Sequence, residues 1–332
     1  MPANTKIPET NIPENIAPFL AHSGWGDAAL DAVPGDASFR RYFRLKKAEG
    51  RRAILMHAPP PHEDPRPFLD VTDYLRQNDF RAPEIYAADA GQGLILLEDF
   101  GDRRMREHLD AQLGDEGQIY RAAIDTLVRL EKAPLADLAP YDEAAYLRET
   151  GLLAEWYLPA MGLNTDADAY YAMWAKALAP LKDAPVVTVL RDYHAENIML
   201  LDDKGQGLID YQDALIGHPA YDLVSILQDA RRDVSPQLER AMLLHYAALA
   251  KPGYDLALHY ALLGAQRNTK IIGIFTRLWK RDGKERYLDF LPRMWGLLER
   301  DLEHPGLASL KAWFDRVIPQ ELRANSPLDR GV

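Results

Sequence analysis

The stretch 189–213 reads VLRDYHAENIMLLDDKGQGLIDYQD and decides the expected fold. It places six acidic side chains and one asparagine among short apolar runs. The runs VVTVL (186–190), NIMLL (197–201) and GLID (207–210) have the length and composition of buried strands. DDKGQG, between the last two runs, is a turn sequence. The pattern therefore predicts strands whose ends carry oxygen ligands.

Three polar residues have a specific spacing in this pattern. Asp192 follows the first run, Asn197 stands five residues later, and Asp210 ends the third run. This is the layout of a kinase catalytic loop followed by its metal-binding aspartate. Phosphoryl transfer needs a carboxylate that takes the acceptor's proton, and it needs oxygen ligands for Mg²⁺. One D-x-x-x-x-N match arises by chance in many proteins, but the whole order of strands, turn and ligands is much harder to obtain by accident.

Composition narrows the class of protein. The chain has 332 residues, a net charge of −11 and no cysteine. The acidic balance argues against a nucleic-acid partner, because phosphate neutralisation needs clustered Lys and Arg. The lack of cysteine excludes disulfides and thiolate metal sites. The N-terminal sequence has no apolar core of a signal peptide, and no apolar run reaches the ~20 residues that span a bilayer. We expect a soluble, cytoplasmic protein without a membrane partner.

The first hundred residues are expected to be rich in strands. Residues 1–15 are polar and proline-rich and predict a loose tail. SFRRYFRL (38–45) and AILMHA (53–58) predict a hairpin. FLDVTDYLRQNDF (68–80) has helical spacing, and IYAADAGQGLILLEDF (85–100) reads as strand, glycine turn and strand. Residues 1–100 are therefore predicted to form a small β-rich lobe that binds nucleotide.

Helical patterns dominate after Gly101. The expected helices cover 116–132, 142–161, 166–181, 220–231, 235–250, 255–280 and 285–303. Residues 101–332 are thus predicted to form a larger lobe that carries the catalytic stretch and the acceptor site. The fold class is α+β, with two lobes.

Two segments of the small lobe have features of a nucleotide site. PGDASFRRYF (34–43) joins a glycine and a short polar turn to an aromatic strand, as a loop over phosphates requires. LILLEDFGD (94–102) is an apolar strand leading into a crossing, where a hinge could offer backbone groups to adenine. The seven basic residues of 40–52 are best explained as a solvated hairpin face, with one or two left for phosphates. The candidate nucleotide-binding residues are Gly35, Ser38, Phe39, Arg40, Arg44, Glu98 and Phe100.

With these residues placed, the chain resembles the aminoglycoside phosphotransferase/choline kinase family, which has a protein-kinase-like fold. The sharpest matches are RDYHAEN (191–197), LID (208–210) and HPAYDL (218–223). Within the family, GDASFRRYFR (35–44) and ILMHAPP (54–60) look most like bacterial kinases of the anomeric hydroxyl of N-acetylmuramate and N-acetylglucosamine. The resemblance implies an enzyme that uses ATP and Mg²⁺ in peptidoglycan (cell-wall) recycling.

The resemblance also implies roles for single residues. Asp192 would be the catalytic base, and Asn197 and Asp210 would bind Mg²⁺. Asp222 would be a buried anchor that accepts backbone hydrogen bonds from the catalytic loop. An exposed carboxylate in the first turn of a helix explains Asp222 nearly as well from sequence alone.

Two departures from the family pattern concern phosphate binding. The family's usual histidine two residues before the catalytic Asp is Leu190 here. The strand lysine that holds the nucleotide phosphates is not found in AILMHA, where Met56 or His57 stands nearby. Phosphate neutralisation would then come from other cations, for which the candidates are Arg40, Arg41 and Arg44.

The acceptor is expected to bind between the catalytic loop and the C-terminal helices. The candidate substrate residues are His194, Glu196 and Asp213, which flank the catalytic residues. QRNTK (266–270) interrupts an apolar helical pattern; a solvated helix face is the favoured interpretation and a cleft-lining face is the alternative. Aromatic residues able to stack on a sugar are more readily explained by core packing; they are Trp156, Tyr157 and Trp174.

Two other functions remain open from the sequence. The acceptor could instead be an aminoglycoside, choline or homoserine, since a cationic acceptor needs an acidic pocket or an aromatic cage and the net charge allows one. The chain could also be a catalytically silent nucleotide-binding scaffold. Formation of ADP that depends on a sugar would separate a kinase from such a scaffold.

Overall fold

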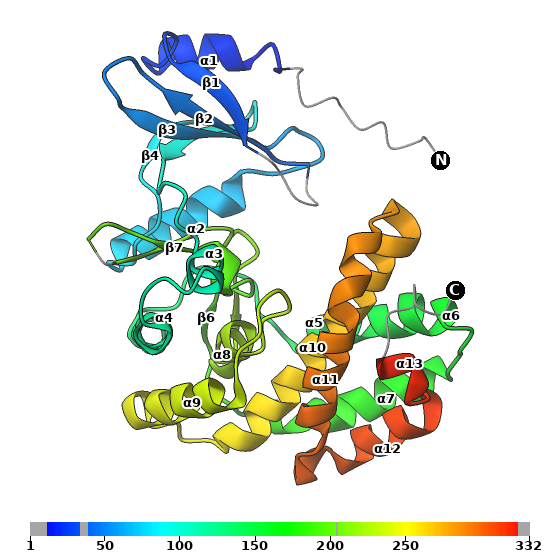
Figure 1. Cartoon of the computed structure of the whole chain (residues 1–332). Helices are drawn as coiled ribbons and strands as arrows, with labels where there is room; N and C mark the ends of the chain where they lie inside the picture. The colour runs from blue at the N-terminus through cyan, green and yellow to red at the C-terminus, as the bar shows by residue number, and fades with distance from the viewer. Residues whose placement is uncertain (1–11, 34–38, 204, 325–332) are drawn as a thin grey trace. The chain divides into compact units, whose positions relative to one another are not determined.

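Five antiparallel strands form the main sheet of the first structural unit (Figure 1). The structure is a computed structural model, and it describes residues 12–33, 39–203 and 205–324. Along the sheet the order is β1-β2-β3-β5-β4. The strands are β1 (Ala29–Val33), β2 (Arg41–Lys46), β3 (Arg52–His57), β4 (Ile85–Asp89) and β5 (Leu94–Glu98). The predicted hairpin and the predicted strand–turn–strand segment are both confirmed.

One face of this sheet carries the core of the first unit. Successive side chains of a strand point to opposite faces, so Phe43 and Leu45 of β2 share a face with Leu55 of β3. All three are buried, and they cluster with residues of the helix α1 (Ile16–His22). The β-rich lobe therefore has its own hydrophobic core under α1.

A hairpin from far along the chain completes the first unit. It consists of β7 (Ile198–Leu200) and β8 (Gln206–Leu208). The Leu200 N–H donates to the Arg103 carbonyl at 2.8 Å, and the Leu208 N–H donates to the Arg81 carbonyl at 2.8 Å. The Tyr211 hydroxyl lies 2.7 Å from the Thr72 hydroxyl on α2 (Arg66–Gln77). The first unit therefore comprises Met1–Arg104 and Ile198–Asp213, rather than a single stretch that ends near residue 100.

The second unit, Met105–Asn197 and Ala214–Val332, is mostly helical. Its helices are α3 (Met105–Asp110), α4 (Glu116–Lys132), α5 (Glu143–Leu152), α6 (Leu158–Ala160), α7 (Ala167–Leu178), α8 (Ala220–Leu227), α9 (Pro236–Ala250), α10 (Leu256–Asp282), α11 (Leu291–Leu302), α12 (Ala308–Val317) and α13 (Glu321–Ala324). The longest, α10, packs against α5, α8 and α11 (Figure 1). Gly273 allows this approach, because a Cβ there would lie 2.4 Å from the Leu152 backbone. The predicted two-part α+β architecture is confirmed.

Side-chain caps explain why the sequence predicted several helix starts well. The capping residues of α4, α5, α7, α9 and α10 are Asp115, Asp142, Asp166, Ser235 and Asp255. In each case the side-chain oxygen of the capping residue accepts a hydrogen bond from the backbone N–H three positions later, a donor that the helix leaves unpaired. The expected helix over 142–161 is interrupted by a π-helical turn at Leu153–Tyr157.

The short strands of the catalytic stretch differ in detail from the prediction. β6 (Val187–Val189) pairs with β9 (Leu215–Gly217), which the sequence analysis did not identify. β8 ends at Leu208, so Asp210 lies outside the strand with φ +60°. The exposed turn residues Asp202 and Asp203 do lie between β7 and β8.

The polar segment 266–270 corrects one expectation. Gln266, Arg267, Asn268 and Thr269 are all buried, so the favoured interpretation of a solvated helix face is wrong. The Asn268 amide donates to Gln228 Oε1 at 2.7 Å and to Asp301 Oδ2 at 3.0 Å. This part of α10 is buried on all sides, because polar as well as apolar neighbours enclose it. Tyr157 and Trp174 are fully buried, as core packing predicts.

No helix in the described part of the chain combines the length and the apolar composition needed to cross a membrane.

Candidate functional site

Asp222 anchors the loop between β6 and β7. Its buried carboxylate accepts the Leu190 N–H at 2.6 Å and the Arg191 N–H at 2.8 Å. Burial raises the pKa of Asp222 to about 7, against the opposing effect of the two N–H donors. Arg191 has φ +67°, and this turn presents the next residue, Asp192. The buried-anchor interpretation of Asp222 is confirmed, and the exposed alternative is wrong.

Asp192 is held as an ionised carboxylate. Burial opposes its ionisation, but positive charges, above all those of Lys270 and Arg267, outweigh burial and hold its pKa below the usual value. The Asp192 carbonyl accepts the Asn197 amide N–H at 2.9 Å, which ties the two ends of the loop together. A carboxylate that stays ionised at neutral pH is able to orient a hydroxyl and take its proton.

Glu149 on α5 joins the catalytic loop to α10. Its carboxylate pairs with Arg191 and with Lys270, whose Nζ lies 3.0 Å away. It also accepts hydrogen bonds from the Tyr141 hydroxyl and, at 3.2 Å, from the Gln266 amide. The sequence analysis missed Glu149, because it lies in no motif and only the tertiary structure brings it to the loop.

The predicted acceptor residues His194 and Glu196 have different surroundings. Glu196 is neutralised by Arg106 and by Arg231, whose Nε lies 3.0 Å from Glu196 Oε2. His194 is buried, and burial lowers its pKa, so its imidazole is neutral at pH 7. Its Nε2 lies 3.4 Å from two N–H donors, on Asn197 and Arg231. Nε2 is therefore the acceptor, and Nδ1 carries the proton.

In the first unit, Arg40 lies beside the predicted metal ligand Asp210. Their ion pair spans 3.5 Å, and Arg40 also lies 3.9 Å from Glu63. The Gln212 amide donates to Asp210 at 3.2 Å and to the exposed Asp213 at 3.3 Å. The structure thus places the candidate cation Arg40 next to the candidate metal ligand Asp210.

Other predicted nucleotide residues fall on the margin of this region. Phe39 is 54% exposed and stacks on His62, with ring centroids 5.0 Å apart. Gly35 and Ser38 lie outside the described residues.

Arg44 fastens the segment that follows β5. Its guanidinium pairs with Asp99 at 2.9 Å and with Asp102 at 2.5 Å, and it donates to the Gly101 carbonyl at 3.0 Å. The Gly101 N–H in turn donates to Asp99 at 2.9 Å. Arg44 is thus engaged with the predicted hinge, and no contact marks it as a phosphate ligand.

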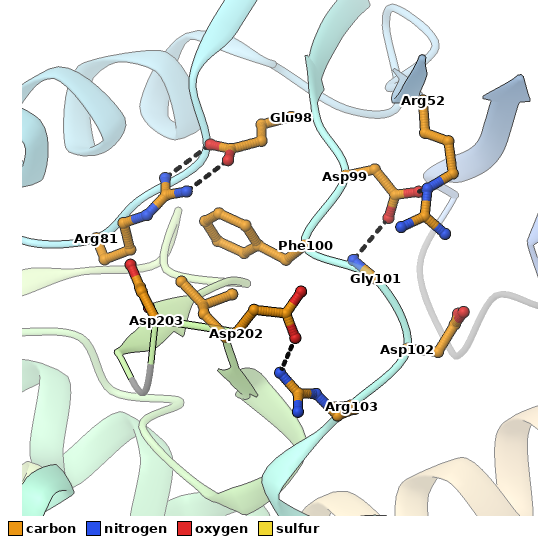
Figure 2. Close-up of a pocket in the computed structure, with 11 residues that line it drawn as sticks. Arg52, Arg81, Glu98, Asp99, Phe100, Gly101, Asp102, Arg103, Asp202 and Asp203 are labelled. Carbon is orange, nitrogen blue, oxygen red and sulfur yellow. Dashed lines mark hydrogen bonds and ion pairs between the residues drawn. The ribbon is translucent and has the colours of Figure 1, made fainter. Parts of the chain in front are cut away.

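A cavity of about 500 Å³ adjoins this hinge (Figure 2). The Arg81 guanidinium donates to both carboxylate oxygens of Glu98, and it lies 4.8 Å from the centre of the Phe100 ring. Phe100 packs on Gly207, where a Cβ would lie 2.6 Å from the ring. Across the cavity, Asp202 pairs with Arg103 at 2.6 Å. The predicted residues Glu98 and Phe100 therefore line one polar cavity with an aromatic wall.

The predicted magnesium ligands offer oxygen donors. Within residues 12–33, 39–203 and 205–324 there is no group of three His, Cys, Asp or Glu side chains placed to hold a metal. Mg²⁺ does not require one, because it usually takes one or two protein ligands and completes its shell with water and phosphate. The Asn197 N–H₂ group is used on the Asp192 carbonyl, so the amide oxygen is the atom suited to a cation. Asn197 and Asp210 thus fit this ion by their chemistry.

Comparison with known proteins supports the same chemistry. The model of a family described as "Phosphotransferase enzyme family" matches residues 29–262. The N-acetylmuramate/N-acetylglucosamine kinase of Caulobacter vibrioides is 37% identical, covering 92% of this chain and 97% of that protein. The kinase of the same name from Pseudomonas putida is 35% identical over 90% of this chain and 92% of its own length.

A solved structure agrees on the fold. The choline kinase LicA of Streptococcus pneumoniae superposes with a TM-score of 0.63 at 15% identity, covering 89% of this chain and 99% of that one. The protein-kinase-like fold expected from the catalytic stretch is thereby confirmed. The predictions of an enzyme and of a phosphotransferase are confirmed as well, and the scaffold without catalytic activity is not supported.

Proposed function

Because the chain belongs to the phosphotransferase enzyme family, we propose that it transfers a phosphoryl group from ATP to the anomeric hydroxyl of N-acetylmuramate and N-acetylglucosamine. The observation that carries this proposal is the 37% identity, over 92% of the chain, to a kinase named for these two sugars. The 15% identity to the choline kinase supports only the shared fold.

In this proposal Asp192 is the catalytic base. An anomeric hydroxyl is more acidic than other sugar hydroxyls, so one carboxylate suffices to take its proton while the oxygen attacks the γ-phosphorus. The lowered pKa of Asp192 supports the role, since the group is ionised throughout the neutral range. Asp222, Glu149 and Arg191 act by positioning the loop.

Asn197 and Asp210 are the proposed Mg²⁺ ligands, and bound Mg²⁺ would neutralise charge on the phosphates. Arg40 adds positive charge near Asp210 and would neutralise part of the phosphate charge that a strand lysine neutralises in the family. The cavity beside Glu98 and Phe100 is the proposed place for the base of the nucleotide, held by backbone groups of the hinge. Gly35, Ser38, Phe39 and Arg44 complete the proposed nucleotide set.

His194, Glu196 and Asp213 are the proposed acceptor residues. His194 supports this best, because its protonated Nδ1 is buried and has no hydrogen-bond acceptor among the described residues. A sugar hydroxyl could accept from it. Glu196 is already bound by two arginines and is better suited to holding those arginines in place.

The test identifies the product by its chemistry. Purified protein is incubated with ATP, Mg²⁺ and each sugar, and ADP, reducing ends and acid-released phosphate are measured. A 1-phosphate lacks a free reducing end and is labile in mild acid, whereas a 6-phosphate keeps its reducing end. ADP formation with persisting reducing ends would move the reaction to another hydroxyl. Stimulation by kanamycin or choline, with neither sugar active, would reject the acceptor.

A further inference from the structure

Arg267 on α10 is a buried cation with an unpartnered guanidinium nitrogen. The residue is 5% exposed, and its buried Nη1 has no hydrogen-bond partner. Across the described residues its guanidinium makes no ion pair either. Burying a charged group without a partner is costly, so natural proteins rarely leave one unless it meets a ligand or substrate. The cost at Arg267 therefore needs an explanation.

The position of Arg267 relates it to the catalytic loop. Lys270 stands one turn further along the same helix, and its Nζ lies 3.4 Å from the Tyr221 hydroxyl and 3.0 Å from Glu149. These contacts turn this side of α10 toward α8 and the loop. Arg267 is within electrostatic reach of the same loop, since its charge lowers the pKa of both Asp192 and Asp222.

The neighbouring polar groups divide into engaged and unengaged ones. Lys270 is committed to Glu149, and Asp222 is committed to two backbone N–H groups. Arg267 and the Nδ1–H of His194 are both buried donors near Asp192, and neither has an acceptor within the described part of the chain. Two unused donors beside the base indicate that the site receives an oxygen-rich, anionic molecule.

We propose that Arg267 binds the carboxylate of an acidic N-acetylamino sugar and thereby sets the preference for that acceptor over a neutral one. The inference rests on the proposed function and adds a specificity residue to it. N-acetylmuramate carries a carboxylate on a lactyl ether, whereas N-acetylglucosamine has a plain hydroxyl at that carbon. A guanidinium suits a carboxylate because its planar N–H groups can meet both oxygens. His194 would contact the part that the two sugars share.

The experiment compares kcat/KM for the two sugars in the wild type and in Arg267→Gln. Hydrogen bonds between charged groups suggest that the value for N-acetylmuramate falls about 10- to 100-fold, mainly through KM. The value for N-acetylglucosamine should change less than about 3-fold, because no carboxylate is lost from its complex. Arg267→Lys keeps the charge without the fork, so its ratio of the two values should lie between those of the wild type and the Gln variant.

Arg277→Gln is the control, a less buried arginine on α10 that should leave the ratio unchanged. An equal fall for both sugars in Arg267→Gln would overturn the proposal, because it would place Arg267 on the shared sugar, the phosphate or Asp192. A changed ratio in the control alone would overturn it too.

A binding measurement without turnover protects the test against loss of catalysis. Calorimetric titration of N-acetylmuramate into Asp192→Asn, with and without Arg267→Gln, should show affinity lost only in the double variant. Equal affinity in both would reject the carboxylate contact. If the wild type phosphorylates neither sugar but binds N-acetylmuramate through Arg267, the proposed function fails while the contact stands.

Discussion

The arginines near the segment after β5 form ion pairs within the protein, whereas Arg267 of α10 forms none among the described residues. In the first unit, Arg44, Arg81 and Arg103 each meet a carboxylate of the same unit. In the second unit, Arg267 is more deeply buried than any of these and meets none within the described residues. Other cations of the second unit do have a carboxylate partner, because Glu149 pairs with both Arg191 and Lys270.

The difference separates two uses of charge. A paired arginine fixes the backbone that carries its partner, as Arg44 fixes the turn at Gly101. A buried arginine without an ion pair fixes no backbone segment in the free protein, and in our proposal Arg267 gains its partner from a ligand. Substitutions should therefore affect stability in the first case and acceptor preference in the second.

The largest expected effect comes from the proposed base, Asp192. Asp192→Asn keeps the shape of the side chain but cannot take a proton, and we expect kcat to fall by about 10³-fold or more. Nucleotide affinity, measured by titration with a non-hydrolysable ATP analogue, should stay within about 3-fold of the wild type. A variant with nearly normal turnover would remove Asp192 from its role.

Glu149→Ala removes a carboxylate that pairs with two cations of the second unit. Two partly buried cations, Arg191 and Lys270, would lose a carboxylate partner, so the unfolding free energy should fall by about 2 to 4 kcal/mol. Urea denaturation followed by circular dichroism measures this. Glu149→Gln retains hydrogen bonding and is the matched control, with a smaller loss. If the Ala variant were as stable as the wild type, pairing would not be what holds the loop to α10.

Arg44→Ala and Arg103→Ala contrast a buried with an exposed pairing in the first unit. The Asp99 side chain, which Arg44 contacts, is 2% exposed. Loss of the Arg44 contact should therefore lower the unfolding free energy by about 2 kcal/mol and raise the KM for ATP. The partner of Arg103 is the fully exposed Asp202, so that change should stay within about 0.5 kcal/mol. Thermal unfolding and ATP kinetics on both variants provide the comparison, and equal effects would contradict it.

The last expected effect concerns a buried pair without charge. The His218 Nδ1 accepts the Ala220 N–H at 3.0 Å, and its Nε2 lies 2.8 Å from His259. Burial lowers the pKa of His218 to about 3. The unfolded chain therefore takes up a proton below pH 6.5 that the folded chain does not, and stability falls with acidification.

This loss should amount to about 1.4 kcal/mol per pH unit below 6.5. Urea unfolding at pH 7.0, 6.0 and 5.5 measures the slope. In His218→Asn the slope should be shallower by about that amount, because one titrating group is gone. An identical slope in the variant would assign the acid sensitivity to other residues.

Much of the fold follows from local patterns in the sequence. Alternating strands around 41–57 and capped helices such as α4 and α9 carry their signals within a few residues. The short elements α1, β1 and β9 were missed because each has seven residues or fewer and gains its stability from tertiary packing.

The candidate site was predictable only where a motif carries it. Asp192, Asn197, Asp210 and Asp222 lie at fixed spacing, so family resemblance finds them. Glu149 and Arg267 lie at no such spacing. Arg267 belongs to a polar run on a long helix, and sequence cannot tell whether such a run faces water or a buried site. The structure resolves this in favour of burial.

The late hairpin β7–β8 also sets an order for biosynthesis. The first unit draws on residues up to Arg104 and then on Ile198–Asp213, so the 93 residues 105–197 separate the two parts. At elongation rates of about 5 to 20 residues per second, a ribosome needs roughly 5 to 20 s to synthesise them. During that interval the Arg81 and Arg103 carbonyls lack their partners from the hairpin, and Phe100 lacks its packing on Gly207. The nascent N-terminal part should therefore be open to chaperones and proteases until residue 213 has left the exit tunnel.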